Sequence, residues 1–535
     1  MRIRTRKNLR KKNAVISVFF MLPLIGFGGY LGACLYIIED VASFTFNLTP
    51  PDTSYFTPLD EINTTYLEQM AHYYDDQMER YHMKGTNISV NIEFKNSSYN
   101  EVEEWKGTDN GALALGYALA SQCFRYKVAL MEGNQAELDN ATRMVKKMVY
   151  GFSNMLAAPN GGIGPDYPGT PARFVCSPES REYHPWMFDE HPRHFNGTGA
   201  YSKWRVRLYT SRDELAGYYI GLACVLKFID PTNNTDSEWC VERVKLLVAQ
   251  LIEGFKKTNW LVVGGNGEPV GSDLNPQLEG SMWQLTLMRL GATAYPQRYD
   301  SLYHHVASKF LELNFAKMGS IWNTVSEYYA LTFSMTVEYS LIILEDNPQL
   351  KHYYIKNFEN GFYSYVRYHR NAYYNLIHLA FMTMVSDSSV YEDPDYTDTT
   401  IRHDILDQLW RFKTNGWTEG IRNYNISIRP NSTRSTSNNT EIAKKNDVSS
   451  IDKWNDFFDN HAFGSLFSWL GEQFDYDEPL YTLPITVSEY KLDRFLWEHN
   501  KFRGEGGTPE GNGLEQATPA SYLIVYWLAR FYDVI

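Results

Sequence analysis

Short polar clusters recur where apolar helical segments are expected to begin, and they hold the side chains best suited to acid–base chemistry. The first two carry Asp: Thr108–Gly111 contains Asp109, and Thr210–Glu214 contains Asp213 beside Glu214. Further clusters with acid, amide, arginine or aromatic side chains stand at 275–279, 323–328, 370–375 and 454–461. Two carboxyl groups that face one substrate can act as general acid and general base. Asp, Ser, Thr and Asn also cap helix N-termini, so capping explains each cluster taken separately, and their recurrence is what favours a common site.

The candidate residues divide into carboxylates and substrate-binding groups. Asp109 and Asp213 form the first candidate catalytic pair, with Glu214 and Glu327 in reserve. Because the first two open consecutive helices, we expect them to face each other, and mutual repulsion with partial burial to raise the pKa of one. The planar guanidinium of Arg212 suits bidentate binding of a substrate carboxylate. The other candidate binding residues are Glu279, Trp283, Trp322, Asn323, Tyr328, Tyr374, Asn375, Trp454 and His461.

The elements that must position these residues are paired helices. Apolar spacing of helical period predicts a leading helix over 57–80. Paired segments follow at 108–130 with 134–157, 211–229 with 236–258, 275–291 with 296–313, 323–345 with 348–368, 371–387 with 400–414, and 454–474 with 517–534. First members are apolar all round and second members are amphipathic, which predicts inner and outer helices. Six such hairpins predict an all-α chain folded as an (α/α)6 toroid, which we favour over a solenoid because no repeat of strong sequence identity accompanies them.

Segments outside the helices are of two kinds. Short strand-like pieces lie near 86–94 and 260–264. Long loops are expected at 158–200, 421–450 and 476–516, and long loops in compact domains are usually functional or disordered.

This layout, with polar clusters at the starts of the inner helices, resembles the six-hairpin glycosidase superfamily over about residues 57–535. The resemblance is one of architecture and implies sugar-active chemistry at one mouth of the toroid. A glycoside hydrolase would use two carboxyls about 5–10 Å apart, one protonated and one ionised. A polysaccharide lyase or epimerase would instead use Tyr328 or Tyr374 as base with Arg212 as carboxylate neutraliser. A non-catalytic glycan-binding or cell-envelope protein is the alternative from another class.

Composition agrees with a carbohydrate partner and argues against nucleic acid. The 535 residues include 50 basic and 63 acidic side chains, a formal net charge of −13, whereas a nucleic-acid protein needs a dominant basic surface. Aromatic residues make up 15% of the chain, and Tyr and Trp pair an apolar face with a polar tip, which suits core packing and stacking on sugar rings.

The N-terminal region predicts a membrane anchor. A basic tail at 1–14 precedes an uncharged apolar segment at 15–38, which as a helix would be about 36 Å long and would span a bilayer. Basic residues before the first span hold that end in the cytoplasm, so the linker at 39–56 and the domain at 57–535 are expected outside or in a lumen. A lipoprotein cleaved before Cys34 and a cleaved signal peptide are the alternatives.

Three further features bear on compartment and cofactors. N-glycosylation sequons, which suit an exported protein, begin at Asn47, Asn63, Asn87, Asn96, Asn140, Asn196, Asn233, Asn425, Asn431 and Asn438. Cys224 and Cys240 flank a turn and either form a disulfide or remain free buried thiols. No cofactor is expected. The oxygen-rich stretch Gly264–Asp273 resembles a calcium loop, but it lacks the EF-hand spacing and is more simply a solvent-exposed turn.

Overall fold

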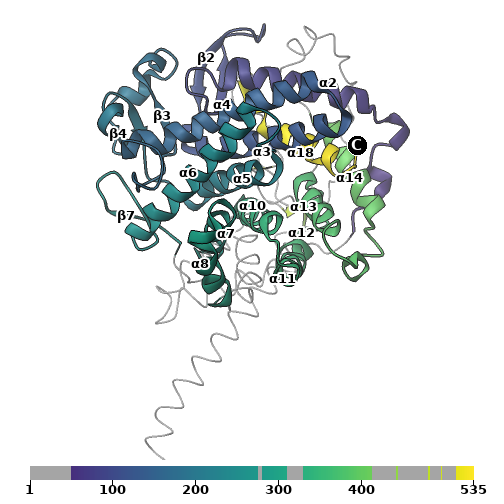
Figure 1. The fold of residues 1–535 in the computed structure, drawn as a ribbon. Coiled ribbons are helices and arrows are strands. Elements are labelled where there is room, and N and C mark those ends of the chain that lie inside the picture. Colours follow the sequence, from purple (N-terminus) through teal and green to yellow (C-terminus); the bar gives the residue numbers. More distant parts are fainter. Residues whose placement is uncertain are drawn as a thin grey trace, which may run out of the picture.

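The computed structural model describes residues 50–274, 280–309, 329–412, 442–443, 480–481, 496 and 514–535. Most of this part of the chain is helical, which confirms the all-α class (Figure 1). The predicted tail and membrane anchor lie outside the described residues. Within the described ranges, no helix combines the length and the apolar character needed to cross a bilayer.

One set of helices occupies the centre of the molecule (Figure 1). These are α3 (Gly111–Glu132), α5 (Arg212–Phe228), α7 (Gly280–Ala294), α10 (Tyr329–Leu344), α13 (Ala372–Met382) and α18 (Ala520–Phe531). Each helix of this set contacts the next, from α3 through α5, α7, α10 and α13 to α18, and α18 contacts α3 again. α3 and α5 are buried over nearly their whole circumference, as expected for helices that are apolar all round.

A second set of helices packs against the first. Its members are α2 (Thr64–Gln77), α4 (Gln135–Asn160), α6 (Thr235–Lys257), α8 (Pro296–Lys309), α11 (Pro348–Phe358) and α14 (Asp398–Arg411). Each contacts a helix of the central set: α4 contacts α3, α6 contacts α5, α8 contacts α7, α11 contacts α10, α14 contacts α13, and α2 contacts α18. These helices alternate buried and exposed residues. The bounds of α4, α6 and α14 lie within three residues of the predicted second members. α8 and α11 begin where predicted, but α11 ends at Phe358 rather than at 368, and α2 begins at Thr64 rather than at 57.

Glycines let α3 and α5 approach closely. A Cβ atom on Gly217 would lie 2.3 Å from the carbonyl oxygen of Ala112, and one on Gly116 would lie 2.0 Å from the carbonyl oxygen of Gly217. One turn further along, Gly221 meets Gly116 and Leu119. Since later residues of one helix meet later residues of the other, the two helices are parallel and begin at the same end.

α7 and α10 also run in a common direction. The Thr286 hydroxyl of α7 donates to the Val337 carbonyl of α10 at 3.4 Å, and Arg289 Nε donates to the Leu344 carbonyl at 2.7 Å. Near the opposite end of the set from the helix starts, the ring centroids of Phe531 in α18 and Phe124 in α3 are 5.7 Å apart. These contacts bring the ends of distant segments together in one aromatic core.

The last predicted hairpin is wrong in one respect. The segment 517–534 was expected to be an amphipathic outer helix, but every residue of α18 from Ala520 to Ala529 is buried. Its sequence, ASYLIVYWLA, is apolar on all sides, so it packs between α3, α13 and α14, with α2 as its outer partner. The Tyr522 hydroxyl donates to the Leu67 carbonyl of α2 at 3.1 Å, which joins the two ends of the described chain. The segment 454–474 lies outside the described residues.

The described residues also form four small antiparallel sheets. Strands β1 (Asn91–Phe94), β2 (Val102–Lys106) and β10 (Glu515–Gln516) form an antiparallel sheet in the order β10–β1–β2, in which Ile92 pairs with Trp105 and Gln516. Strands β3 (Phe174–Cys176), β4 (His194–Asn196) and β5 (Arg205–Arg207) form a second, in the order β3–β5–β4. Two-stranded pairs join β6 (Leu261–Val263) to β7 (Pro269–Asp273) and β8 (Ile442–Ala443) to β9 (Leu480–Tyr481). β1 and β6 confirm the predicted strand-like pieces.

Short helical turns complete the described elements. The 3-10 turns are Thr53–Tyr55, Leu59–Glu61, Thr108–Asn110, Pro178–Ser180, Pro185–Phe188, Gly199–Tyr201 and Ser388–Tyr391. π-helical turns follow α2 at Met78–His82 and α11 at Glu359–Tyr363, and the latter leads into α12 (Ser364–Val366).

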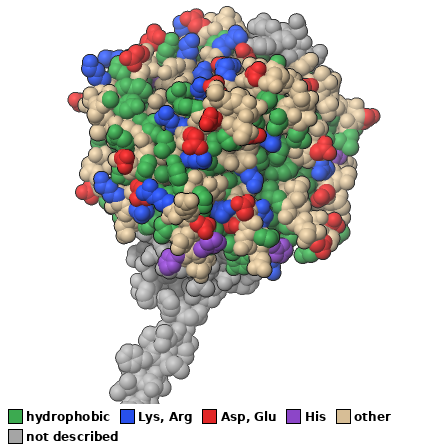
Figure 2. All heavy atoms as spheres, in the orientation of Figure 1, with side chains coloured by type: hydrophobic (Ala, Val, Ile, Leu, Met, Phe, Trp, Pro, Cys, Tyr) green, Lys and Arg blue, Asp and Glu red, His purple; other side chains and the backbone are tan. Residues whose placement is uncertain are grey.

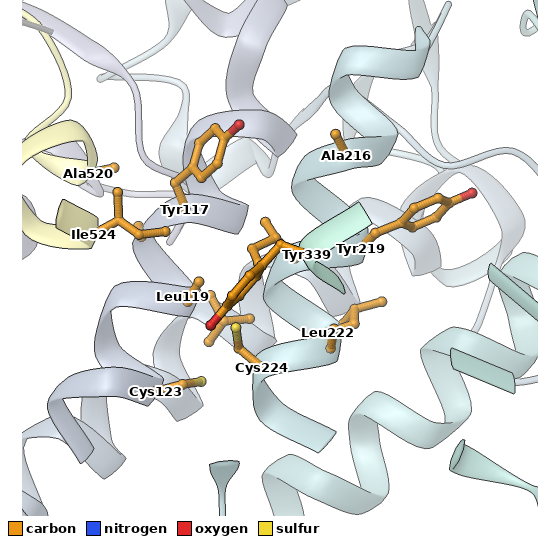
Figure 3. Packing of buried hydrophobic residues seen from close by; sticks show 14 of the residues in the cluster. Tyr117, Leu119, Cys123, Ala216, Tyr219, Leu222, Cys224, Tyr339, Ala520 and Ile524 are labelled. Atoms are coloured by element: carbon orange, nitrogen blue, oxygen red, sulfur yellow. The ribbon is translucent and has the colours of Figure 1, made fainter. Parts of the chain in front are cut away.

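The core contains cysteines as well as aromatic side chains. Figure 3 shows Cys123 of α3 and Cys224 of α5 close to Tyr339 of α10. Cys123, Cys176, Cys224 and Cys240 are all buried and free, so the structure has the thiol form of Cys224 and Cys240 and not the disulfide. Cys34 lies outside the described residues.

The surface features predicted from the sequence fall as follows. The sequon residues Asn63, Asn96, Asn140, Asn196 and Asn233 are exposed and Asn87 is half-buried, whereas Asn47, Asn425, Asn431 and Asn438 lie outside the described residues. The stretch considered as a calcium loop forms the turn between β6 and β7, closed by a hydrogen bond from Gly264 N to the Glu268 carbonyl at 2.9 Å. Basic and acidic side chains are interspersed over the face seen in Figure 2.

Candidate active site

The starts of α3 and α5 are tied together by one arginine, Arg173, which precedes β3. Its Nη1 donates to the Asp109 carbonyl, its Nε to the Tyr209 carbonyl, and its Nη2 to the Ser211 hydroxyl, each at 2.6 Å. Asp109 lies just before α3, and Tyr209 and Ser211 lie just before α5. The guanidinium therefore fixes the two polar clusters relative to each other, and it places the predicted acids of both at the same end of the central helices.

Asp109 is exposed and makes ion pairs with two further arginines. Its Oδ1 accepts a hydrogen bond from Arg207 Nη2 at 2.5 Å and lies 3.6 Å from Arg193 Nη1. Arg207 belongs to β5, and Arg193 stands directly before β4, which pairs with β5. The second sheet thus presents two guanidinium groups to the carboxylate in front of α3.

Asp213 lies in the first turn of α5 and is half-buried. Its carboxylate accepts a close hydrogen bond from the hydroxyl of Ser211, the residue that precedes the helix. An acid in the first turn is stabilised by the helix dipole, so this position suits a negative charge. Burial raises the pKa of Tyr117 in α3 and the charge of Asp213 adds to this effect, against the hydrogen bond with Thr336, which lowers it.

Glu214, the next residue, is fully buried and bridges the two helices. Its Oε2 accepts a hydrogen bond from the backbone N–H of Ala112 at 2.9 Å, so a side chain of α5 caps the start of α3. Its Oε1 is buried and has no hydrogen-bond partner among the described residues. Burial raises the pKa of Glu214 well above its usual range, and the charge of Asp213 adds to this effect, against the opposing influence of Arg173. The raised pKa therefore belongs to Glu214, the reserve candidate for catalysis that directly follows Asp213 in the chain.

The neutral state of Glu214 gives a testable pH dependence. A carboxyl whose folded pKa lies above its ordinary value of 4.5 costs stability once the pH exceeds that value, because the unfolded chain releases the proton first. Glu214→Gln mimics the neutral acid, so we expect it to gain stability relative to the wild type as the pH rises from 4 to 8. The slope is at most about 1.4 kcal/mol per pH unit.

Urea unfolding at a series of pH values measures this difference. The control is Glu238→Gln, because Glu238 is an exposed acid in the first turn of α6. A Glu214→Gln protein less stable than the wild type at pH 8 would show that Glu214 is ionised in the folded state.

Arg212 and Trp283 form the junction between α5 and α7. The indole Nε1 of Trp283 donates to the Arg212 carbonyl at 2.8 Å, and the Arg212 guanidinium carbon lies 5.8 Å from the centroid of the same ring. Trp283 is almost completely buried. It therefore fixes the start of α5 against α7, whereas Arg212 is only half-buried and stands next to Asp213.

Tyr374 and Asn375, both predicted to bind substrate, lie in the interior. The Tyr374 hydroxyl is 2.8 Å from the Thr332 hydroxyl of α10. The Asn375 amide accepts from the Tyr363 hydroxyl and donates to Tyr396 and Asp404 at 3.0–3.3 Å. These contacts give both residues a structural role in joining α13 to its neighbours.

Several candidate residues cannot be placed. Glu279, Trp322, Asn323, Glu327, Tyr328, Trp454 and His461 lie outside the described residues.

The sequence did not reveal the arginines that organise this site. Arg173, Arg193 and Arg207 belong to or flank the second sheet, most of which lies in the stretch predicted as the long loop 158–200. Trp186 from the same stretch lies with its ring centroid 5.9 Å from the Arg207 guanidinium carbon. The alternation Arg205–Val206–Arg207 is a strand signal, but three residues are too few to separate a strand from a loop.

No group of three or more His, Cys, Asp or Glu side chains within the described ranges is placed to hold a metal ion. The described side chains at the starts of α3 and α5 include carboxylates, arginines and aromatic rings. Comparisons with models of protein families, with curated proteins and with solved structures gave no match.

Proposed function

We propose that this chain is a carbohydrate-active enzyme, and specifically a glycoside hydrolase that uses two carboxyl groups. The observation that carries the proposal is the arrangement around Arg173, which holds the acid-bearing starts of two consecutive buried helices at one end of the helical core. Asp109 supplies one of the carbonyls that this guanidinium binds, Asp213 accepts from the Ser211 hydroxyl that it also binds, and Arg193 and Arg207 pair with Asp109.

The proposal includes the (α/α)6 toroid over residues 57–535. It is supported by the closed series of contacts from α3 through α5, α7, α10, α13 and α18 back to α3, with an outer helix against each. It is also supported by the common direction of α3 with α5 and of α7 with α10. In such a ring the segments before the central helices meet at one mouth, where a substrate has access to side chains from several hairpins.

The environments of the two acids suit different roles. Asp109 already pairs with two guanidinium groups, so we assign it the ionised role of base or nucleophile. Asp213 lies beside the buried Glu214, whose raised pKa keeps a proton on this pair of carboxyls, so we assign Asp213 the role of proton donor. In the net reaction the glycosidic C–O bond breaks, the proton of Asp213 goes to the leaving oxygen, and water supplies the new hydroxyl on the anomeric carbon. The remaining proton of the water is taken up by Asp109 where it acts as base, or by Asp213 where Asp109 acts as nucleophile.

The proposed location is the outer or lumenal face of a membrane, with residues 15–38 as anchor and the N-terminus in the cytoplasm. The exposure of the sequon residues Asn63, Asn96, Asn140, Asn196 and Asn233 supports an exported domain, because glycan can be attached only at accessible positions.

A digestion screen tests the proposal. The full chain is incubated with a panel of oligosaccharides and polysaccharides, and the release of new reducing ends is measured, with the Asp213→Asn protein as the blank. Release by the wild type and not by the blank supports a hydrolase. Unsaturated products would indicate a lyase instead, and binding without any product would indicate a non-catalytic glycan-binding protein.

A further inference from the structure

Two arginines at the site already hold a carboxylate, that of Asp109. Arg207 contacts it at 2.5 Å and Arg193 at 3.6 Å, from neighbouring positions of the second sheet. Planar guanidinium groups match the geometry of a carboxylate and bind it more specifically than lysine does. The Asp109 side chain thus shows that this pair of arginines is arranged around a carboxylate-sized anion.

The arrangement is accessible and incompletely satisfied. The side chains of Arg193 and Asp109 are 47% and 51% exposed, so a ligand can reach both. Arg207 is 12% exposed, and its buried Nε has no hydrogen-bond partner among the described residues. Among the described residues, Arg207 forms an ion pair with one carboxylate, that of Asp109. The same carboxylate also pairs with Arg193.

The surroundings of the pair carry further positive charge. Burial and, after it, the charges of His191, Arg207 and Arg205 lower the pKa of His194, the neighbour of Arg193, to about 4. Arg205 donates to the Met187 and Asp189 carbonyls and to the Asn196 side chain, and it forms no ion pair with a carboxylate of the described residues. A chain with a net charge of −13 would repel a polyanion, so a local group of arginines is what such a ligand needs to bind.

We propose that the substrate is an acidic glycan whose sugar carboxylate binds between Arg193 and Arg207, beside Asp109. This inference rests on the proposed function and adds the class of substrate to it. The sugar ring next to the bound carboxylate then lies in front of α3 and α5, within the reach of Asp213, and the Trp186 ring that packs near Arg207 contributes an apolar face.

Binding measurements on the full chain test the inference. Oligosaccharides that contain uronic acids are compared with their carboxyl-reduced counterparts, which keep the same linkage and length but carry no charge. By calorimetry we expect the uronate to bind at least about 10-fold more tightly, since hydrogen bonds to charged groups are stronger than neutral ones. The preference should fall as salt is raised from 50 to 500 mM, because exposed charges are screened.

Variants assign the binding to these arginines. Arg193→Gln is expected to lose most of the preference for the uronate over the reduced sugar, and Arg193→Lys should retain part of it. Because Arg193 is exposed, neither change should unfold the protein. The matched control is Arg181→Gln, since Arg181 is an exposed arginine of the same segment that packs on the Phe188 ring at 5.0 Å.

The possible outcomes separate this inference from the proposed function. Equal binding and turnover of charged and reduced sugars would overturn the acidic substrate and leave the hydrolase standing. Binding of sulfated but not of carboxylated glycans would also overturn it. Failure to bind or cleave any glycan in either form would overturn both proposals together. A loss of preference in Arg181→Gln equal to that in Arg193→Gln would show a non-specific effect of charge and refute the assigned site.

Discussion

Asp213→Asn is expected to lower turnover of the glycan substrate by about 10²–10⁴-fold and to leave folding intact. The amide has nearly the shape of the carboxylate and still accepts a hydrogen bond from the Ser211 hydroxyl, so the start of α5 keeps its contact. It can no longer give a proton to the leaving oxygen. Initial rates measure the first effect, and urea unfolding measures the second.

Asp109→Asn should lower turnover by a similar factor, because the neutral amide cannot serve as base or nucleophile. The variant also weakens the ion pairs with Arg193 and Arg207, but the exposure of Asp109 keeps the cost in stability small. The matched control is Asp236→Asn. Asp236 is a first-turn acid of the outer helix α6, half exposed and paired with Lys146 at 2.6 Å, and its replacement should not change turnover.

Full activity in both Asp109→Asn and Asp213→Asn would show that the two acids are structural. The next candidate carboxylate would then be Glu327, which stands before α10 in the sequence. A loss of activity that is matched by a loss of stability would likewise count against a chemical role, because capping alone would explain it.

The helices could be predicted because the residues that a helix buries recur in the sequence at helical spacing. The bounds of α3, α4, α5 and α6 match the predicted segments because each has a clear apolar pattern and a capping residue or glycine at its ends, such as Asn134 and Gly133 between α3 and α4. The place of α18 was misassigned for a physical reason. Order along the chain suggested an outer helix, but its uniformly apolar composition, which was visible, requires a buried one.

The site could be predicted only in part, since its contacts are long-range. The recurrence of acids at helix starts identified Asp109, Asp213 and Glu214. It could not show that Glu214 caps a different helix through Ala112, because this contact depends on the close packing of α3 and α5. Arg173 likewise acts through backbone carbonyls that have no sequence signature.

Asp407→Asn is expected to cause the largest loss of stability, about 3–5 kcal/mol. Asp407 of α14 is fully buried and accepts hydrogen bonds from Arg370 at 2.5 Å, from Arg411 at 2.8 Å and from the backbone N–H of Thr57 at 2.8 Å. Removing its charge leaves two buried guanidinium groups with Asp404 as the remaining carboxylate that pairs with Arg370. The contact with Thr57 also attaches the segment before α2 to α14.

The loss should depend on pH in a defined direction. Burial alone would raise the pKa of Asp407, but the charges of Arg370 and Arg411 outweigh it, so the pKa lies below its ordinary value of 3.8. A lowered pKa means that the stabilisation is complete above 3.8 and is lost as the pH falls through the folded value. The wild type should therefore keep its advantage over Asp407→Asn from pH 8 down to about pH 5 and lose it in acid.

Urea unfolding of both proteins between pH 8 and pH 2 measures this advantage, with Asp76→Asn as control. Asp76 forms an exposed pair with Arg80 at 3.0 Å, and exposed pairs contribute about 0–1 kcal/mol, so this variant should follow the wild type at every pH. If Asp407→Asn lost no more than Asp76→Asn, the two guanidinium groups would have to be neutralised by Asp404 or by water. The buried arginines would then not be what fixes the N-terminal segment to α14, and the hydrogen bond to Thr57 would be left as its main attachment.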